Sequence, residues 1–196
     1  MTGDPSFSVV IPVFNEAETI DELVGRSISA CEDTGLCFEI ILVDDGSTDE
    51  SADKIDNAAE KHPGRVVGIF LNRNYGQHPA VIAGFEHSRG DFVITMDADL
   101  QNPPEEIPRL VDTIRKGYDV VGSIRTDRQD SLFRRVASSV INRKFRKWTG
   151  IMMHDYGCMM RAYSRPVVDA MVKYASRGVF VPILANSFSK NTPRSR

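Results

Sequence analysis

The sequence is poor in cysteine and has no long apolar run. Its three cysteines, Cys31, Cys37 and Cys158, form no CxxC pair. An odd number of scattered cysteines argues against a disulfide framework or a cysteine-based zinc site, and it indicates a reducing compartment. No apolar stretch approaches the roughly 18 to 20 residues needed to cross a bilayer, and no signal peptide opens the chain. These absences predict a cytosolic chain that spans no membrane.

Two common nucleotide-binding motifs are missing as well. The chain contains neither GxGxxG nor GxxxxGK[ST], so the dinucleotide-binding and P-loop classes lose their main support. Because glycines do not build a phosphate cradle here, a metal ion would have to neutralise a bound diphosphate.

The composition is that of one soluble globular domain, with 41% hydrophobic and 26% charged residues among 196. The net charge of −3 conceals an uneven distribution. Residues 1–60 contain fifteen acidic and two basic residues, whereas residues 125–147 contain eight basic and two acidic ones. The basic segment is either a solvated helix or a surface that contacts phosphates, on a lipid head group or a membrane.

Short apolar runs alternate with stretches of helical spacing along the first 124 residues. The runs are rich in Val, Ile and Phe, as is typical of strands buried on both faces; they span 7–14, 38–45, 66–72, 91–97 and 119–124. The predicted helices span about 16–33, 49–61, 77–88 and 104–116, with Ser47 and Thr48 as the N-cap of the second. Repeated strand–helix–strand units predict an α/β fold with a doubly wound, mainly parallel sheet flanked by helices.

Residues 131–148 have the pattern of an amphipathic helix with a basic polar side. Apolar residues recur at i, i+4 spacing from Leu132 to Trp148, whereas Arg134 and Arg135 lie towards the other side. Such a stripe is more often core packing than a membrane device. The basic bias and the aromatic end favour a membrane surface.

Polar side chains follow the ends of several predicted strands, where open parallel sheets bind their ligands. Asp97 and Asp99 end the fourth strand, and residues i and i+2 of a strand point to the same side, so both can face one ion. Carboxylate oxygens suit Mg²⁺ or Mn²⁺, and Gln101 could add a neutral oxygen. Asp44 and Asp45 end the second strand and can accept from a base N–H or ribose hydroxyls. This pattern suits a nucleoside diphosphate leaving group.

Three segments, "VVIPVFNE", "VDDGSTD" and "DADLQNPPEEI", resemble family 2 glycosyltransferases of the GT-A fold in their order and spacing. The segments "LNRNYGQHPAVIAGF", "GYDVVGSIRTDRQD" and "DYGCMMRAY" are similar to the polyprenyl-phosphate glycosyltransferases of that family. The likeness covers about residues 6–188. It implies a GT-A nucleotide-sugar glycosyltransferase domain over 1–188, with the helix 131–148 near a lipid acceptor, and a divergent polar tail at 189–196. The C-terminal transmembrane helices of the family are expected to be absent.

The resemblance also implies which residues hold the UDP-sugar donor. The residues expected to bind its uridine part are Pro12, Phe14, Glu16, Asp44 and Asp45. The residues expected to hold Mg²⁺ or Mn²⁺ against the diphosphate are Asp97, Asp99 and Gln101, of which Asp97 also counts as a substrate contact.

A second set is implied for the phosphate of the acceptor, undecaprenyl phosphate. These residues are Arg125, Arg134, Arg135 and Ser139. Asp99 and Asp155 are the catalytic candidates. Asp155 matches the position of an aspartate proposed as base in relatives, and it acts either as a base or as a group that orients an arginine or the acceptor.

The implied reaction is an inverting displacement, in which a phosphate oxygen of the lipid attacks the anomeric carbon of the UDP-sugar. A phosphate monoester has its second pKa near about 6, so the nucleophile is already mostly ionised and needs no strong base. A glucose-type UDP-sugar remains open as donor, as does a truncated fragment that only binds UDP. A sugar nucleotidyltransferase would want a glycine-rich turn where "PVFNE" stands. The expected setting is a membrane surface, at the cytoplasmic face of the bacterial inner membrane, with a possible homo-oligomer and no nucleic acid.

Overall fold

The structure is a computed structural model of the chain, and it describes residues 4–122, 159–175, 181–189 and 191. The predicted helix 131–148 lies outside the described residues. No described helix is both long enough and apolar enough to cross a membrane.

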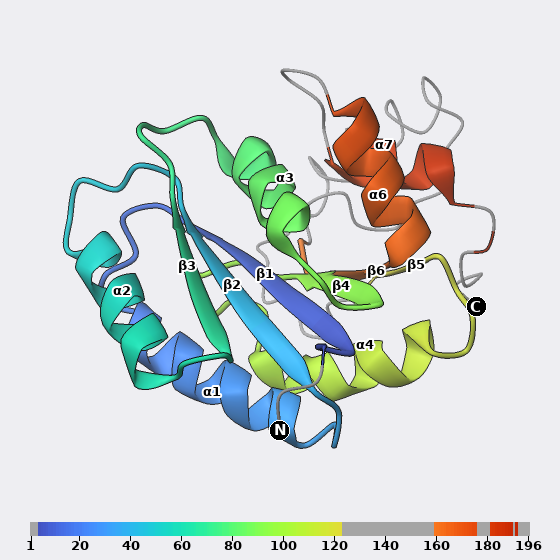
Figure 1. Cartoon of the computed structure of the whole chain (residues 1–196), viewed down its shortest axis with the longest axis horizontal. Coiled ribbons are helices and arrows are strands. Elements are labelled where there is room, and N and C mark those ends of the chain that lie inside the picture. Colours follow the sequence, from blue (N-terminus) through green and yellow to red (C-terminus); the bar gives the residue numbers. More distant parts are fainter. Residues whose placement is uncertain (1–3, 123–158, 176–180, 190, 192–196) are drawn as a thin grey trace, which may run out of the picture.

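A six-stranded mixed sheet forms the centre of the described part of the chain (Figure 1). Its strands are β1 (Phe7–Val13), β2 (Phe38–Asp44), β3 (Val66–Phe70), β4 (Phe92–Thr95), β5 (Val120–Gly122) and β6 (Arg161–Ser164). They lie in the order β3-β2-β1-β4-β6-β5, in which β1 to β4 run parallel and β6 runs antiparallel to both of its neighbours. The α/β fold with a mainly parallel sheet is therefore confirmed, and β6 is a strand that the apolar pattern did not predict.

Helices cover both faces of the sheet. They are α1 (Ile20–Glu32), α2 (Ser51–Lys61), α3 (Gln77–His87), α4 (Ile107–Ile114), α6 (Arg165–Tyr174) and α7 (Val181–Phe188), with a short 3₁₀ helix η1 (Pro104–Glu106) before α4. Figure 1 shows α1, α2 and α4 on one face and α3, α6 and α7 on the other. The doubly wound arrangement is confirmed, and α6 and α7 extend it beyond the helices predicted from the sequence.

Strand β1 lies at the middle of the core, and all seven of its residues are buried. Val9 and Ile11 pack into the cluster under α1 and α4, whereas Val10 packs into the cluster under α3 and α6. At the beginning of the strand, the Phe7 ring stacks on the Phe92 ring of β4 with their centroids 5.4 Å apart. A strand that is apolar on both faces fixes the sheet between two helix layers, and so fixes the edge at which its loops emerge.

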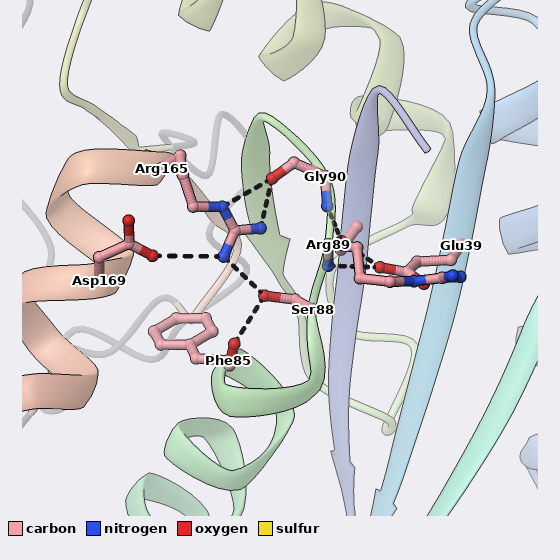
Figure 2. A network of polar contacts seen from close by, with 8 residues as sticks. Glu39, Phe85, Ser88, Arg89, Gly90, Arg165 and Asp169 are labelled. Carbon is pink, nitrogen blue, oxygen red and sulfur yellow. Dashed lines mark hydrogen bonds and ion pairs between the residues drawn. The ribbon is translucent and has the colours of Figure 1, made fainter. Parts of the chain in front are cut away.

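A network of polar contacts ties the α3–β4 turn to the starts of β1 and β2 and to α6 (Figure 2). The buried carboxylate of Glu39 accepts hydrogen bonds from the Ser8 hydroxyl at 2.7 Å and from the backbone N–H of Arg89 at 2.7 Å. The Gly90 N–H donates to Ser8 Oγ at 3.0 Å, and Arg165 of α6 donates from Nε to the Gly90 carbonyl at 2.8 Å. These contacts fix the start of β4, whose other end leads to Asp97.

Strands β5 and β6 are antiparallel, and the end of β5 lies opposite the beginning of β6. Gly122 is the register partner of Arg161, and Arg161 is in turn the partner of Thr95 at the end of β4. The chain therefore leaves the sheet after Gly122 and re-enters it at Arg161, at the same edge at which β4 ends.

The segment after α7 also contacts the sheet. The backbone N–H of Asp119 donates to the Asn191 carbonyl at 2.7 Å, and the Asn191 N–H donates to Asp119 Oδ2 at 2.8 Å. Asn191 belongs to the tail at 189–196 that the sequence marks as divergent, and its backbone nevertheless pairs with the residue before β5.

Candidate active site

A pocket of about 260 Å³ lies where β1, β2, β3 and β4 end. Its described lining residues come from the end of β1, the loops that follow the four strands and the first residue of α3: Pro12, Val13, Phe14, Glu16, Asp45, Asn74, Gly76, Gln77, Asp97, Ala98 and Asp99. Binding at the carboxyl ends of parallel strands is the general rule for open α/β sheets. The site predicted from strand-end residues is therefore a real cavity.

The structure brings most of the predicted donor-binding residues together. Those that line the pocket are Pro12, Phe14, Glu16, Asp45, Asp97 and Asp99. Asp44 and Gln101 are described but are not among its lining residues. Five predicted residues on the acceptor side lie outside the described part of the chain: Arg125, Arg134, Arg135, Ser139 and Asp155.

The two acids Asp97 and Asp99 differ in how firmly they are held. Asp97 is half-buried; its Oδ1 accepts from Gln77 Nε2 at 2.6 Å and its Oδ2 from Asn102 Nδ2 at 3.2 Å. Asp99 is exposed, and its Oδ1 accepts from the backbone N–H of Gln101 at 3.0 Å. Both carboxylates face the same pocket, as expected.

The prediction from the sequence assumed that the two aspartates face the same side because side chains alternate along a strand. The structure gives a different reason. Strand β4 ends at Thr95, and Asp97 and Asp99 lie in the turn beyond it. Leu100 in this turn has a φ of +58°, a left-handed conformation that is uncommon for residues other than glycine. A turn of this kind, and not an extended strand, presents the two carboxylates to the cavity.

Asp45 holds the loop between β3 and α3. Its side chain is buried, and its two carboxylate oxygens accept from the backbone N–H groups of Tyr75 and Gly76, both at 2.8 Å. Gly46 follows with a φ of +70°, and a Cβ built on it would lie 2.4 Å from the Arg73 carbonyl carbon. The two loops are thus in direct backbone contact. The neighbouring Asp44 accepts from the Ser47 N–H at 3.2 Å.

Hydrogen bonds join the β1–α1 loop to the β2–α2 loop. Ser47 and Thr48 take part in these bonds, so the prediction that they form the N-cap of α2 is wrong. Helix α2 begins at Ser51 after Glu50, and not after Ser47 and Thr48. Ser47 Oγ instead accepts from the Asn15 N–H at 2.9 Å, and the Thr48 N–H donates to Asn15 Oδ1 at 2.8 Å. These bonds fix the loop that carries Phe14 and Glu16, because Asn15 lies between them.

The pocket is acidic, and its charge bears on what it can bind. Among the described residues that line it are four carboxylates, from Glu16, Asp45, Asp97 and Asp99, and no basic side chain. A diphosphate would be repelled unless a cation came with it. Hard oxygen donors fit Mg²⁺ or Mn²⁺, which bind through one or two carboxylates and keep positions for phosphate and water. Within the described ranges no group of three or more His, Cys, Asp and Glu side chains is placed to hold a metal. Asp97 and Asp99 are the two neighbouring carboxylates of the pocket that could contact such a cation.

Five lining residues were not assigned a role from the sequence; besides Val13 and Ala98, next to predicted residues, three lie between β3 and the start of α3. Asn74, Gly76 and Gln77 come from the loop after β3, which no acid marks. The available signal was a glycine between a strand end and a predicted helix, in "NYGQH". Gly76 has a φ of +98° and directly precedes α3, so it turns the chain toward the pocket.

Comparison with known proteins agrees with this geometry. The family described as "Glycosyl transferase family 2" matches residues 8–172. Undecaprenyl-phosphate 4-deoxy-4-formamido-L-arabinose transferase of Pseudomonas aeruginosa is 58% identical over 185 residues, which cover 94% of this chain and 55% of that protein. The protein of the same name from Edwardsiella ictaluri is also 58% identical, with 57% of its length covered. The chain thus spans little more than half the length of these curated relatives.

Solved structures show the same architecture. Glucosyl-3-phosphoglycerate synthase from Mycobacterium tuberculosis in complex with UDP aligns with a TM-score of 0.66 at 26% identity, covering 94% of this chain and 65% of that one. The mannosyltransferase PcManGT from Pyrobaculum calidifontis in complex with GDP-Man and Mn²⁺ aligns with a TM-score of 0.66 at 18% identity, covering 97% and 55%. At that identity the second match shows the fold alone. The fold is GT-A, and because the family match covers most of the chain, this protein belongs to glycosyl transferase family 2.

Proposed function

We propose that the chain is the donor-binding part of an enzyme that transfers 4-deoxy-4-formamido-L-arabinose from UDP to undecaprenyl phosphate. The observation that carries the proposal is the convergence of Asp97 and Asp99 on one pocket, in a chain 58% identical to transferases of that name. We propose that this reaction serves lipid A modification and polymyxin resistance.

In this proposal the pocket binds a UDP-sugar together with Mg²⁺ or Mn²⁺. Asp97 and Asp99 would hold the cation, with Gln101 as a possible neutral ligand from the same turn. The bound cation would offset the charge that builds on the leaving diphosphate. Pro12 and Phe14 provide an apolar wall for the base, and Phe14 is 43% exposed and thus open to stacking. Glu16, Asp44 and Asp45 are the proposed acceptors for the uridine N–H and hydroxyl groups.

The acceptor would approach from the segment between β5 and β6. A phosphate oxygen of undecaprenyl phosphate forms the new bond to the anomeric carbon, the bond from that carbon to the UDP oxygen breaks, and the configuration inverts. Because the phosphate is already mostly ionised, the attack needs no strong base. The residues proposed to hold the phosphate in line are Arg125, Arg134, Arg135 and Ser139, and Asp155 is proposed to orient them or to act as base.

This role for the β5–β6 segment is supported by the topology. Gly122 and Arg161 are register partners at the edge of the sheet where β4 ends. The chain between them therefore starts and finishes next to the donor pocket. The proposed setting is a membrane surface, at the cytoplasmic face of the bacterial inner membrane, and the proposed assembly is a homo-oligomer.

The donor half of the proposal is tested by calorimetric titration of UDP into the chain, with and without Mn²⁺. The variant combines Asp97→Ala with Asp99→Ala, and its matched control combines Asp56→Ala with Asp112→Ala, two exposed helical aspartates that do not line the pocket. We expect Mn²⁺-dependent binding in the wild type and the control, and its loss in the variant. No binding to the wild type under either condition would refute the proposal.

The sugar is tested by competition for the same site. UDP-4-deoxy-4-formamido-L-arabinose is expected to displace UDP at lower concentration than UDP-glucose does. The reverse order would favour a glucose-type donor. A chain that binds the donor but transfers nothing to undecaprenyl phosphate in detergent would support the alternative of a fragment that binds UDP only.

A further inference from the structure

The carboxylate of Asp97 is held on both oxygens by amide groups from two different elements. Gln77, the first residue of α3, donates from Nε2 to Oδ1 at 2.6 Å. Asn102, which is 3% exposed and follows the turn after Asp99, donates from Nδ2 to Oδ2 at 3.2 Å. One donor comes from the start of α3 and the other from the loop that carries Asp97 itself, so the rotation of the carboxylate is fixed from two sides.

The chemistry of the donors suits a carboxylate that has to receive a cation. An amide N–H donates a hydrogen bond but carries no charge, so it orients the carboxylate without neutralising it. These two hydrogen bonds therefore leave the negative charge of the carboxylate in place. Lysine or arginine at either position would compete with a metal ion for the same charge.

Gln77 is itself positioned from a third strand end. Asp45 accepts from the N–H groups of Tyr75 and Gly76, the two residues directly before α3. The left-handed Gly46 lies against the backbone of Arg73, so the loop cannot move away from β2 without breaking these contacts. A continuous path of hydrogen bonds and backbone thus runs from Asp45 through Gly76 and Gln77 to Asp97.

We propose that Gln77 and Asn102 are positioning residues that fix the Asp97 carboxylate for the metal ion, and that Asp45 acts through Gln77 by holding the loop before α3. This inference rests on the proposed function, because it concerns the metal-dependent step of donor binding. It gives Asp45 a part in positioning in addition to the uridine contact proposed above.

The experiment measures the Mn²⁺ concentration that gives half of the maximal UDP binding, for the wild type and for Gln77→Ala. Positioning residues around a metal typically change metal affinity by about 10-fold to 100-fold, and we expect the Mn²⁺ requirement to rise by about 10-fold. Uridine lacks the diphosphate, so its binding, followed by ligand-observed NMR, is expected to stay unchanged. The control is Glu86→Ala, an exposed position near the other end of the same helix.

Asp45 is tested by a double-mutant cycle. Asp45→Asn alone is expected to raise the Mn²⁺ requirement, since an amide in place of the carboxylate accepts from only one of the two N–H groups. In the Gln77→Ala background, Asp45→Asn is expected to raise the Mn²⁺ requirement little further, because the hydrogen bond from Gln77 to Asp97 is already absent. Full additivity would show that Asp45 does not act through Gln77.

The outcomes separate this inference from the proposed function. A wild type without Mn²⁺-dependent UDP binding would overturn both. A wild type that binds, together with a Gln77→Ala variant of unchanged Mn²⁺ requirement, would overturn the positioning role alone. Loss of uridine binding in Gln77→Ala would make Gln77 a direct substrate contact and would likewise overturn it.

Discussion

Glu39 and Arg89 form an ion pair in which the two partners are unequally buried. Arg89 Nη2 lies 2.8 Å from Glu39 Oε2, while the Glu39 side chain is 2% exposed and the Arg89 side chain is 60% exposed. Glu39 also accepts from the Ser8 hydroxyl and from the Arg89 backbone N–H, as Figure 2 shows in part. The Glu39 carboxylate is therefore a buried hydrogen-bond acceptor within the sheet, whereas the Arg89 guanidinium faces the solvent.

This asymmetry predicts unequal losses of stability. Glu39→Ala leaves the buried Ser8 hydroxyl and a backbone N–H without their acceptor, and we expect it to lower the free energy of unfolding by about 2 to 4 kcal/mol. Arg89→Ala keeps both of those bonds and is expected to cost clearly less. Chemical denaturation of the two variants measures the difference. Equal losses would mean that the ion pair, and not the buried acceptor, carries the stability.

Alanine in place of two helical glycines is predicted to change the free energy of unfolding in opposite directions. Gly25 lies in α1 with nothing within 4 Å of a built Cβ, so Gly25→Ala is expected to raise the free energy of unfolding by about 0.5 to 1 kcal/mol. A Cβ on Gly84 of α3 would lie 2.3 Å from Val10 Cγ1, so Gly84→Ala is expected to lower it by about 1 to 3 kcal/mol. Thermal and chemical unfolding of both variants test the pair, and a shared sign would contradict the packing of α3 on β1.

The contact between Arg26 and Glu105 predicts a pH dependence. Arg26 donates from Nε and Nη2 to the two carboxylate oxygens of Glu105, each at 2.9 Å, and these bonds hold the pKa of Glu105 below its usual value. A lowered pKa stabilises the fold above the unfolded pKa of about 4.3, and this contribution disappears as the pH falls through the folded pKa. We expect the stability difference between wild type and Glu105→Gln to be largest above about pH 5 and to shrink towards about pH 3.

The control for this pH effect removes the partner. In an Arg26→Ala background, the difference made by Glu105→Gln is expected to lose most of its pH dependence. Because the Glu105 side chain is 57% exposed and that of Arg26 is 34% exposed, solvent and salt screen the contact, so the whole effect is small and is best measured at low salt. A difference that stays constant from pH 3 to about 6 in the wild-type background would argue against the contact in solution.

The two described cysteines are predicted to differ in reactivity. Burial raises the pKa of the Cys31 thiol to about 12, whereas Cys37 is exposed. In a Cys158→Ser variant, we expect a thiol reagent at about pH 8 to modify one cysteine in the native state and two after denaturation. Adding Cys37→Ser should abolish the native reaction. Fast modification that persists in that variant would show that the helix α1 opens readily.

The parallel strands could be predicted because strands buried on both faces consist of nearly continuous apolar residues. Every residue of β1 and of β2 is buried, and both read as near-continuous hydrophobic segments. Strand β6 could not be predicted in the same way. It has only four residues, begins with Arg161 and is followed by a helix with proline in its first turn. Its place is set by pairing with β4 and β5, which are distant in sequence.

The same difference separates the site residues that the sequence could predict from those that it could not. Asp97 and Asp99 are found from the sequence because acids directly after a buried strand are informative on their own. Asn74 and Gln77 are not, because their loop reaches the pocket only through the bonds between Asp45 and the backbone before α3. Such a contact joins residues 30 and 31 positions apart and leaves no local pattern.

The pairing of Gly122 with Arg161 has a consequence for how the enzyme can change. The segment 123–158 is bounded by two adjacent antiparallel strands, as in a hairpin with a long insertion. A replacement segment has to meet the sheet at the same two points, Gly122 and Arg161, to keep the pairing of β5 with β6. Under the proposed function, the module that chooses the acceptor is therefore exchangeable. A chimaera with this segment from a relative would keep the donor and could adopt a different lipid.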